Sequence, residues 1–354
     1  MKTPEDIARF IEHHAPHLNI SKPPIPLKGG LMNHVWKVPC EPNSVILKHA
    51  PPYIATVPEI ELDDSRIIFE AEALQAFLAE GDLSNIPSPS IRPPLLLFRH
   101  DESHVILLED IGDGVDLAVW LGHSKHTTEK FGTLLGRFIG ALHRESFDKP
   151  SFAQRFDNHA IQKTRYNVQY ESIGPLCLGA GIEDAEDLGL KARQLGTRLL
   201  QEGTCLIMGD LWPASVHVTP NGLRVIDWEF VHYGNPAQDI AHFASHLWML
   251  QHRLPECKDA VHTFWDNFAA AYASEIESIH DLLWTLPVYE DASIHFGSEI
   301  LVRTIGPFKQ SYLYDNLPDN APLLKQAISQ ATGRIRNAQH ITDLLSMLDS
   351  YTPV

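Results

Sequence analysis

Two aspartates near the middle of the chain have the setting that phosphate or metal chemistry needs. Asp210 comes shortly after the apolar run Cys205–Ile207, and Asp227 directly follows a second apolar run, Leu223–Ile226. Because Pro220-Asn221-Gly222 is a turn signal, we expect the second run to fold back beside the first. Both carboxylates would then face one pocket, an arrangement that proteins keep when a cation or a proton transfer uses the pair.

Oxygen-bearing side chains around these aspartates form a candidate ligand set for a magnesium nucleotide. Ser215 follows Asp210 in the same loop, and Glu229 lies beyond Asp227 in an Asp-x-Glu pattern. The set offers one candidate base, Asp210, and hard oxygen ligands for Mg²⁺ from Ser215, Asp227 and Glu229. The plainer alternative is a group of solvated loop acids with no shared task.

This stretch resembles the catalytic and metal loops of the aminoglycoside phosphotransferase and choline kinase superfamily, whose pattern is His-Gly-Asp, four residues, Asn and then a metal-binding Asp. Met208 stands at the His position and Ser215 at the Asn position. The Asp-x-Glu of Asp227 and Glu229 is most similar to 5-methylthioribose kinases, which also carry Ser at the position matching Ser215. The resemblance implies an ATP- and Mg²⁺-dependent kinase in which Asp210 receives the proton of the acceptor hydroxyl.

Composition limits the classes of partner. The 354 residues are 44% hydrophobic and 21% charged, which suits a large core and more than one lobe. A net charge of −17 argues against nucleic acid or an anionic membrane as partner, because either would approach against the field of the whole molecule. We therefore expect a small-molecule acceptor, while the oligomeric state stays open.

The cysteines and the N-terminal segment indicate the compartment. The four cysteines are scattered without a Cys-x-x-Cys pair, which fits free thiols in a reducing compartment. The N-terminal stretch is too charged for a signal peptide, and no run reaches the roughly 18 apolar residues of a membrane span. We expect a cytoplasmic protein.

A glycine turn and a strand lysine suggest a phosphate-binding region near the N-terminus. Two strand-like pieces flank Gly29 and Gly30, and glycines let backbone amides approach phosphate oxygens. Such a pair is more often a plain hairpin turn. Lys48 strengthens the case, because the strand period places it on the face of Ile46, where it needs a partner. We assign Gly29, Gly30, Lys48 and the neighbouring Asn33 to the nucleotide site.

Glu70 is the expected partner of Lys48. Positions 67, 70, 71, 74, 77 and 78 share one face of a predicted helix, and all but Glu70 are apolar. An acid inside an apolar stripe requires a partner. The superfamily pairs a strand lysine with a helix glutamate, so the resemblance implies that Lys48 contacts the nucleotide phosphates while Glu70 holds it. Glu72, off the stripe, is the lesser candidate, and the alternative is that Lys48 and Glu70 are unrelated surface residues.

A strand-like run from His104 leads to Gly112-Asp113-Gly114, a flexible crossing where we place a lobe boundary. Residues 1–112 would form a nucleotide-binding lobe and residues 113–354 a catalytic and acceptor-binding lobe. In relatives the adenine lies against the backbone of such a segment, which implies Glu109 to Ile111 here. The expected fold class is α+β, a two-lobed protein-kinase-like fold with a small β-rich N-lobe and a larger, mainly helical C-lobe.

Histidines on predicted helices are weaker candidates. His242 and His246 lie one turn apart, a spacing that can bind metal, but no third ligand accompanies them in the sequence. We therefore expect a packed or solvated helix face there, and a structural role for His143. Asp239 resembles the superfamily acid that braces the catalytic loop, although an acid in a first helical turn is also favoured by the helix dipole.

The likeness to methylthioribose kinases continues to Glu299–Gly306, where those kinases have two adjacent arginines. Here Val302 precedes Arg303. We expect Arg303 to bind a sugar- or polyol-like acceptor with fewer charged contacts than methylthioribose receives. Two alternatives stay open: a catalytically silent nucleotide-binding protein, and a metal-dependent hydrolase, which would leave Lys48 and the glycine turn unexplained.

Overall fold

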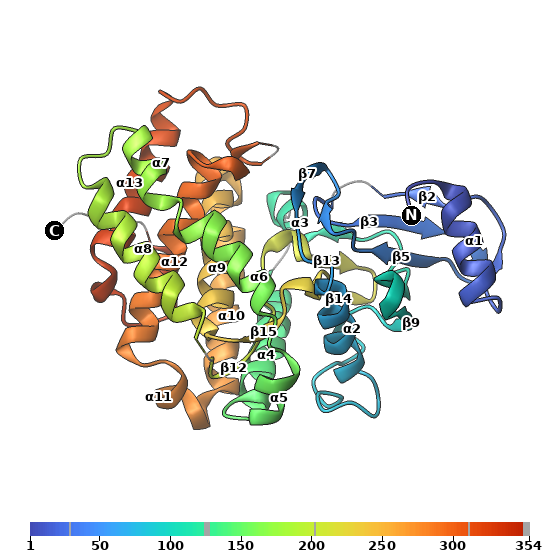
Figure 1. Cartoon of the computed structure of the whole chain (residues 1–354). Coiled ribbons are helices and arrows are strands. Elements are labelled where there is room, and N and C mark those ends of the chain that lie inside the picture. The colour runs from blue at the N-terminus through green and yellow to red at the C-terminus, as the bar shows by residue number, and fades with distance from the viewer. Residues whose placement is uncertain (28–29, 124–127, 202, 311, 350–354) are drawn as a thin grey trace.

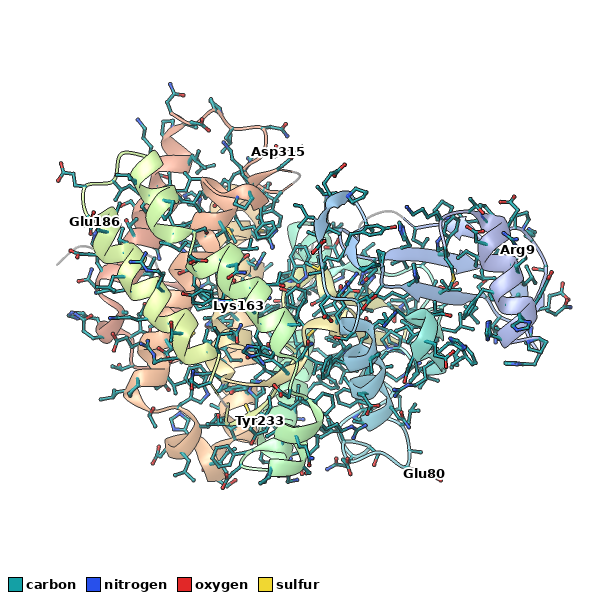
Figure 2. The ribbon with its side chains drawn as sticks, viewed as in Figure 1. Arg9, Glu80, Lys163, Glu186, Tyr233 and Asp315 are labelled. Atoms are coloured by element: carbon teal, nitrogen blue, oxygen red, sulfur yellow. The ribbon has the colours of Figure 1, made fainter. Side chains whose placement is uncertain are left out.

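The computed structural model describes residues 1–27, 30–123, 128–201, 203–310 and 312–349, and the chain divides into two unequal parts (Figure 1). The smaller part is built around a β-sheet, and the larger part is mostly helical. Polar side chains cover both, with Arg9 and Glu186 at opposite ends of the view (Figure 2). Within the described residues, no helix has the length and apolar character that crossing a membrane requires.

The small part contains a five-stranded antiparallel sheet. Its strand order is β2 (Ile25–Pro26), β3 (His34–Val38), β5 (Val45–His49), β10 (Val105–Glu109) and β9 (Leu96–His100). Two short pairs lie beside it, β1 (Asn19–Ile20) with β4 (Cys40–Glu41) and β6 (Tyr53–Ile54) with β7 (Val57–Glu61). Because side chains alternate along a strand, β5 directs Val45 and Leu47 to one face and Lys48 to the other.

Two helices cover the faces of this sheet. Helix α1 (Pro4–His14) starts at Thr3, whose side chain accepts a hydrogen bond from the backbone N–H of Asp6, and it packs its apolar stripe against Leu47 and its neighbours. Helix α2 (Arg66–Ala76) contacts β9 and β10 and buries the stripe predicted for it. The stripe of α2 was predicted from the sequence and is confirmed.

A second sheet joins the two parts of the molecule. Its order is β11 (Val115–Asp116), β13 (Val216–Thr219), β14 (Gly222–Val225) and β8 (Ile91–Arg92). The run after Pro220-Asn221-Gly222 therefore pairs with β13, and β12 (Cys205–Ile207) pairs with β15 (His232–Gly234). The expectation that Leu223–Ile226 folds back beside Cys205–Ile207 is wrong, because a short turn brings the nearest preceding segment alongside. The boundary near Gly112 stays a prediction.

The larger part packs long helices around a central one. Its helices are α3 (Leu117–His123), α4 (Glu129–Ser146), α5 (Pro150–Arg155), α6 (His159–Arg165), α7 (Ile173–Gly179), α8 (Ala185–Leu199), α9 (Pro236–Arg253), α10 (Lys258–Glu275), α11 (His280–Leu283), α12 (Leu286–Thr304) and α13 (Pro322–Arg336). Gly132 and Gly136 let α10 approach α4 closely, since a Cβ at either would lie 2.2 Å from a backbone oxygen of α10. Helix α9 is buried on all sides from Pro236 to Gln251, so its polar residues face protein rather than solvent.

Candidate active site

One cavity collects side chains from both parts of the molecule. The predicted site residues that line it are Gly30, Asn33, Lys48, Asp210, Asp227, Glu229 and Arg303. Asp210 and Asp227 thus face one cavity, as expected, although the strands before them are not paired with each other. Gly29 lies outside the described residues.

Lys48 is buried among three carboxylates. Its Nζ lies 2.7 Å from Glu70, 2.9 Å from Asp227 and 3.8 Å from Glu229. Burial works against the charged ammonium, but the three acids raise the pKa of Lys48 above its usual value. The prediction that Glu70 lies against Lys48 is confirmed, whereas Glu72 pairs with Arg155 at 2.7 Å. Arg66 also pairs with Glu229, so three acids face two cations, and a further cation would offset the remaining negative charge.

Arg66 links Asn33, just before β3, to the Asp-x-Glu segment. Its Nε donates to Glu229 Oε2 at 3.1 Å, and its Nη2 donates to Asn33 Oδ1 at 2.9 Å. Asn33 Nδ2 in turn donates to the same Glu229 oxygen at 2.8 Å. The Arg66 side chain is 1% exposed, which the sequence did not predict, because an arginine at the start of a helix ordinarily reaches solvent. These hydrogen bonds hold the Oε2 atom of Glu229 in place. The role of Glu229 as a metal ligand stays a prediction.

The backbone before Asp210 is held by Asp239 at the start of α9. The two oxygens of Asp239 accept from the backbone N–H groups of Met208 and Gly209, each at 2.8 Å. His143 Nε2 lies 3.3 Å from the same carboxylate and its ring is fully buried, a geometry that fits the structural role expected for it. Gly209 has a φ of +79°, and a Cβ there would lie 2.2 Å from Phe230 O. These contacts fix the direction in which Asp210 points.

Asp210 is paired with an arginine that the sequence did not identify. Arg165, at the end of α6, donates from Nη2 to Asp210 Oδ1 at 2.6 Å and to Gly209 O at 2.7 Å. Its guanidinium lies 4.9 Å from the centre of the Phe230 ring. The acids near it raise the pKa of Arg165 even though burial opposes its charge. Arg165 is one of four arginines in residues 151–200, and no spacing pattern distinguishes it, so only the fold shows that it reaches this loop.

Three predicted residues have geometry that bears on their assigned roles. The Ser215 hydroxyl donates to Trp212 O at 2.8 Å and accepts from Trp212 N at 3.2 Å, so it closes the turn after Asp210. The carboxylate of Glu109, at the end of β10, accepts from Arg92 Nη2 at 2.7 Å. Ile111 follows Glu109 in the connection to β11. The assignments of Ser215 to metal and of Glu109 and Ile111 to the nucleotide stay predictions.

Arg303 lines the same cavity and lies inside an aromatic box. Its guanidinium is 5.3 Å from the Trp212 ring, 5.2 Å from Phe308 and 4.9 Å from Tyr312. Its Nε donates to Glu299 Oε1 at 2.7 Å. Arg303 keeps its charge in this buried position because Glu299 raises the pKa that burial would lower.

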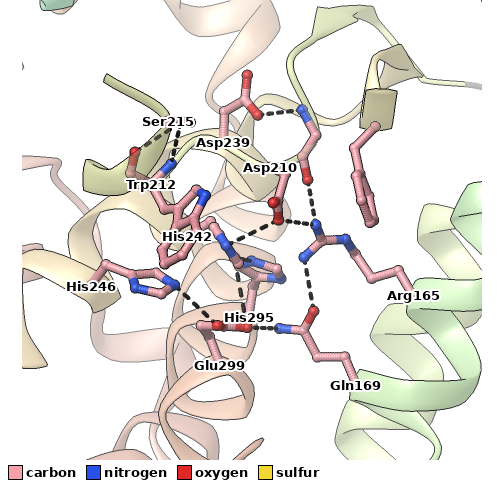
Figure 3. A network of polar contacts seen from close by, with 12 residues as sticks. Arg165, Gln169, Asp210, Trp212, Ser215, Asp239, His242, His246, His295 and Glu299 are labelled. Atoms are coloured by element: carbon pink, nitrogen blue, oxygen red, sulfur yellow. Dashed lines mark hydrogen bonds and ion pairs between the residues drawn. The ribbon is translucent and has the colours of Figure 1, made fainter. Parts of the chain in front are cut away.

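Glu299 is the centre of a buried polar network (Figure 3). Besides Arg303, it accepts from Gln169 Nε2 at 2.9 Å and contacts His246 Nε2 at 3.1 Å. The sequence indicated no third ligand near His242 and His246. That expectation is wrong, because Glu299 comes from α12 and lies with both histidines in a group that could hold a metal ion. Since its oxygens already accept from a guanidinium and an amide, we interpret the group as a hydrogen-bond network.

The fold and the site together define a class of protein. A sheet lysine paired with a helix glutamate, a braced loop carrying Asp210, and Asp227 beside the lysine are the features of a kinase-like phosphotransferase. The chain belongs to the phosphotransferase enzyme family, whose model matches residues 26–278.

Similar proteins agree with this assignment. A 4-hydroxytryptamine kinase from Psilocybe cyanescens is 25% identical over 265 residues, covering 69% of this chain and 72% of that protein. A methylthioribose kinase from Bacillus mycoides is 27% identical and covers 78% and 77%. The structure resembles that of spectinomycin phosphotransferase solved with ADP and spectinomycin, with a TM-score of 0.52, 13% identity and 97% coverage of each chain. The predicted superfamily, the two-lobed α+β kinase-like fold and the class of small-molecule kinase are confirmed.

Proposed function

We propose that this protein transfers the terminal phosphoryl group of ATP to a hydroxyl of a small molecule. The observation that carries the proposal is that one cavity holds Lys48 and Asp227 from the phosphate-binding side together with Asp210 and Arg303. Residues 1–112 would hold the nucleotide and residues 113–354 the acceptor. A kinase built this way works by positioning and by electrostatic stabilisation.

The residues present fit a magnesium ion. Asp227, whose side chain is 46% exposed, and Glu229 offer carboxylate oxygens beside a lysine that carries more negative neighbours than it can neutralise. Ser215 completes the predicted ligand set. When bound, Mg²⁺ would neutralise charge on the nucleotide phosphates.

The chain's own groups have separate tasks. Asp210 orients the acceptor hydroxyl and accepts its proton, and Arg165 holds one oxygen of that carboxylate so that its direction is fixed. Lys48, held by Glu70, meets the nucleotide phosphates. Backbone amides near Gly30 contribute to the same phosphate site.

For the acceptor, Arg303 supports a sugar- or polyol-like molecule. With Nε engaged by Glu299, its remaining N–H donors lie near the aromatic box and suit adjacent hydroxyl oxygens. Val302 is fully buried in the helical core, so this segment of α12 offers one arginine, Arg303, to the cavity. Methylthioribose kinases have two adjacent arginines in the matching segment. We propose that methylthioribose is a poor substrate.

A second acceptor class is favoured by a specific observation. Trp212, Phe230 and Phe308 line the cavity next to Asp210, and flat aromatic walls suit a planar ring. The similarity to a 4-hydroxytryptamine kinase supports including hydroxylated aromatic compounds among the candidates.

The test is a screen for acceptor-dependent ADP release with sugars, polyols, phenols and hydroxyindoles, run with the protein and with Asp210→Asn. This substitution keeps the shape of the side chain but removes the proton acceptor, so turnover should fall by about 10²-fold or more while Mg-ATP binding persists. Near-normal turnover in Asp210→Asn would remove Asp210 from the mechanism. Nucleotide binding without turnover of any acceptor would favour the silent alternative, and acceptor-independent metal-dependent hydrolysis would favour a hydrolase.

A further inference from the structure

A chain of buried side chains leads from the helical core to the carboxylate of Asp210. Tyr170 OH lies 2.7 Å from His295 Nδ1, and His295 Nε2 lies 3.2 Å from His242 Nδ1. His242 Nε2 then faces Asp210 Oδ1 at 3.4 Å. The histidines come from α9 and α12, and both are at most 2% exposed (Figure 3).

The direction of the hydrogen bonds in this chain follows from its far end. The Tyr170 hydroxyl keeps its own proton, since burial raises its pKa, and His295 Nδ1 lies 2.7 Å from it as an acceptor. Tyr170 therefore donates to His295 Nδ1, which leaves the proton of that neutral imidazole on Nε2. His295 Nε2–H in turn donates to His242 Nδ1. A neutral His242 must then carry its proton on Nε2, the atom that faces Asp210.

The opposite tautomer of His242 is disfavoured by its surroundings. It would direct the lone pair of Nε2 at the negative carboxylate of Asp210, 3.4 Å away. It would also gain no hydrogen bond to Glu299, because His242 Nδ1 lies 3.7 Å from Glu299 Oε2. Burial lowers the pKa of His242 and His295, so both rings are neutral at physiological pH.

The Nε2–H of His242 has no hydrogen-bond partner in the structure. The atom is buried, and its 3.4 Å contact with Asp210 Oδ1, an oxygen that also accepts from Arg165, falls outside hydrogen-bond geometry. His242 nevertheless lines the same cavity as Asp210. His242 is 2% exposed, its proton is held on Nε2, and this donor is directed into a substrate cavity without a partner. Such an arrangement is expected of a residue that contacts a ligand.

We propose that His242 donates Nε2–H to the attacking oxygen of the acceptor, making it a catalytic residue that selects hydroxyl over amine acceptors. The inference rests on the proposed kinase function. One hydroxyl can donate to Asp210 and accept from His242 because the two groups are 3.4 Å apart. A hydroxyl oxygen has a second lone pair left to attack phosphorus. A neutral amine has only one, which the N–H of His242 would occupy.

The step balances without a further reactant. The acceptor oxygen forms a bond to the terminal phosphorus of ATP, the bond from that phosphorus to the bridging oxygen breaks, and ADP leaves. The hydroxyl proton passes to Asp210, while His242 keeps its proton throughout. While the proton leaves, the hydrogen bond from His242 holds the attacking oxygen beside Asp210, so His242 acts by positioning the nucleophile.

The first test is independent of turnover. Long-range ¹H–¹⁵N spectra of histidine-labelled protein distinguish the two tautomers, and His242→Gln and His295→Gln assign the signals. We expect the Nε2–H tautomer for both rings at pH 7.5. The Nδ1–H tautomer or an imidazolium at His242 would overturn the inference, whether or not the protein proves to be a kinase.

The second test uses an acceptor found in the screen. His242→Met removes the donor, whereas His242→Gln places an amide N–H near the position of Nε2. We expect kcat/KM for the acceptor to fall roughly 3- to 30-fold in His242→Met, mostly through kcat, and to recover substantially in His242→Gln. The Kd of Mg-ATP should change less than about twofold in both, and this unchanged binding also reports that the variants fold.

Acceptor selectivity and a variant of Tyr170 give two further tests of the contact. The preference for a hydroxyl acceptor over its amine analogue should narrow in His242→Met. Tyr170→Phe removes the phenol that sets the tautomer and should reproduce part of the loss. Equal activity of the Met and Gln variants, or an unchanged preference, would overturn the contact. Absence of turnover with all acceptors would defeat the proposed function and this contact with it, even where the spectra show the Nε2–H tautomer.

Discussion

Lys48 Nζ lies 2.9 Å from Asp227 Oδ1, and this ion pair joins β5 of the small part to the segment after β14. The two residues are 179 positions apart in the chain. The lysine assigned to the phosphates and the aspartate assigned to metal therefore neutralise each other in this structure. Nucleotide and metal together would give each a new partner, so the buried ammonium of Lys48 would keep a compensating charge.

The first prediction concerns the pair of Lys48 with Glu70. Lys48→Met leaves Glu70 buried without its cation, and breaking a buried pair in this way typically costs about 3–5 kcal/mol of the free energy of unfolding. Adding Glu70→Leu should recover much of that loss, because the uncompensated carboxylate is gone. Urea denaturation of the single and double variants measures the coupling. Additive losses would mean that the two side chains do not act as a pair.

The second prediction compares Asp227 with Ser215. Asp227→Ala should abolish Mg-dependent ATP binding, because it removes a charged ligand, whereas Ser215→Ala removes a neutral one. Ser215→Ala should instead lower the free energy of unfolding by about 1–2 kcal/mol, since its hydroxyl makes hydrogen bonds to the Trp212 backbone. Calorimetry with Mg-ATP and denaturation separate the two effects. An unchanged affinity in Asp227→Ala would show that the metal assignment is wrong.

The third prediction concerns Arg303. Hydrogen bonds to a charged group contribute about 1.5–3 kcal/mol, so Arg303→Ala should lower kcat/KM for the acceptor roughly 10- to 150-fold. ATP affinity should not change, because Arg303 lies in the aromatic box beside Glu299. Arg303→Lys is the matched control that keeps the charge and loses the planar fork, and it should recover only part of the activity. An equal loss of ATP affinity would place Arg303 in the nucleotide site or the scaffold, and efficient phosphorylation of methylthioribose would refute the argument from a single arginine.

The fourth prediction concerns stability in acid. Burial lowers the pKa of His295 to about 3, from a usual value of 6.5. Between these values the unfolded chain binds a proton that the folded chain does not. The free energy of unfolding is therefore unaffected by the protonation of His295 above pH 6.5, where the ring is neutral in both states. It falls as the pH drops from 6.5 toward 3.

The size of the effect follows from linkage. The free energy of unfolding should fall by up to about 1.4 kcal/mol per pH unit from this one group. Gln at position 295 cannot titrate, so the free energy of unfolding of His295→Gln should fall less steeply between pH 6 and pH 4.5. The difference in slope should correspond to the uptake of about one proton on unfolding. Parallel slopes for the two proteins in urea denaturation would show that His295 titrates normally.

The sequence by itself determined the features that depend on local spacing. The cap at Thr3, the apolar stripe that isolates Glu70 and the strand period that turns Lys48 away from Leu47 are set by residues within a few positions of one another. The kinase-like fold followed from the motif that carries Asp210. Such signals survive in a single sequence because helix and strand periods relate near neighbours.

Only the tertiary structure decided which distant groups meet. Arg165 reaches Asp210 across 45 positions, Arg66 reaches Glu229 across 163, and Gln169 reaches Glu299 across 130. The strand partner of β14 was also mispredicted, since the sequence allows more than one apolar run to pair with it. A buried charge requires a partner of opposite charge. The packing of α6, α9 and α12 decides which residue that partner is, and the spacing of residues in the sequence does not show it.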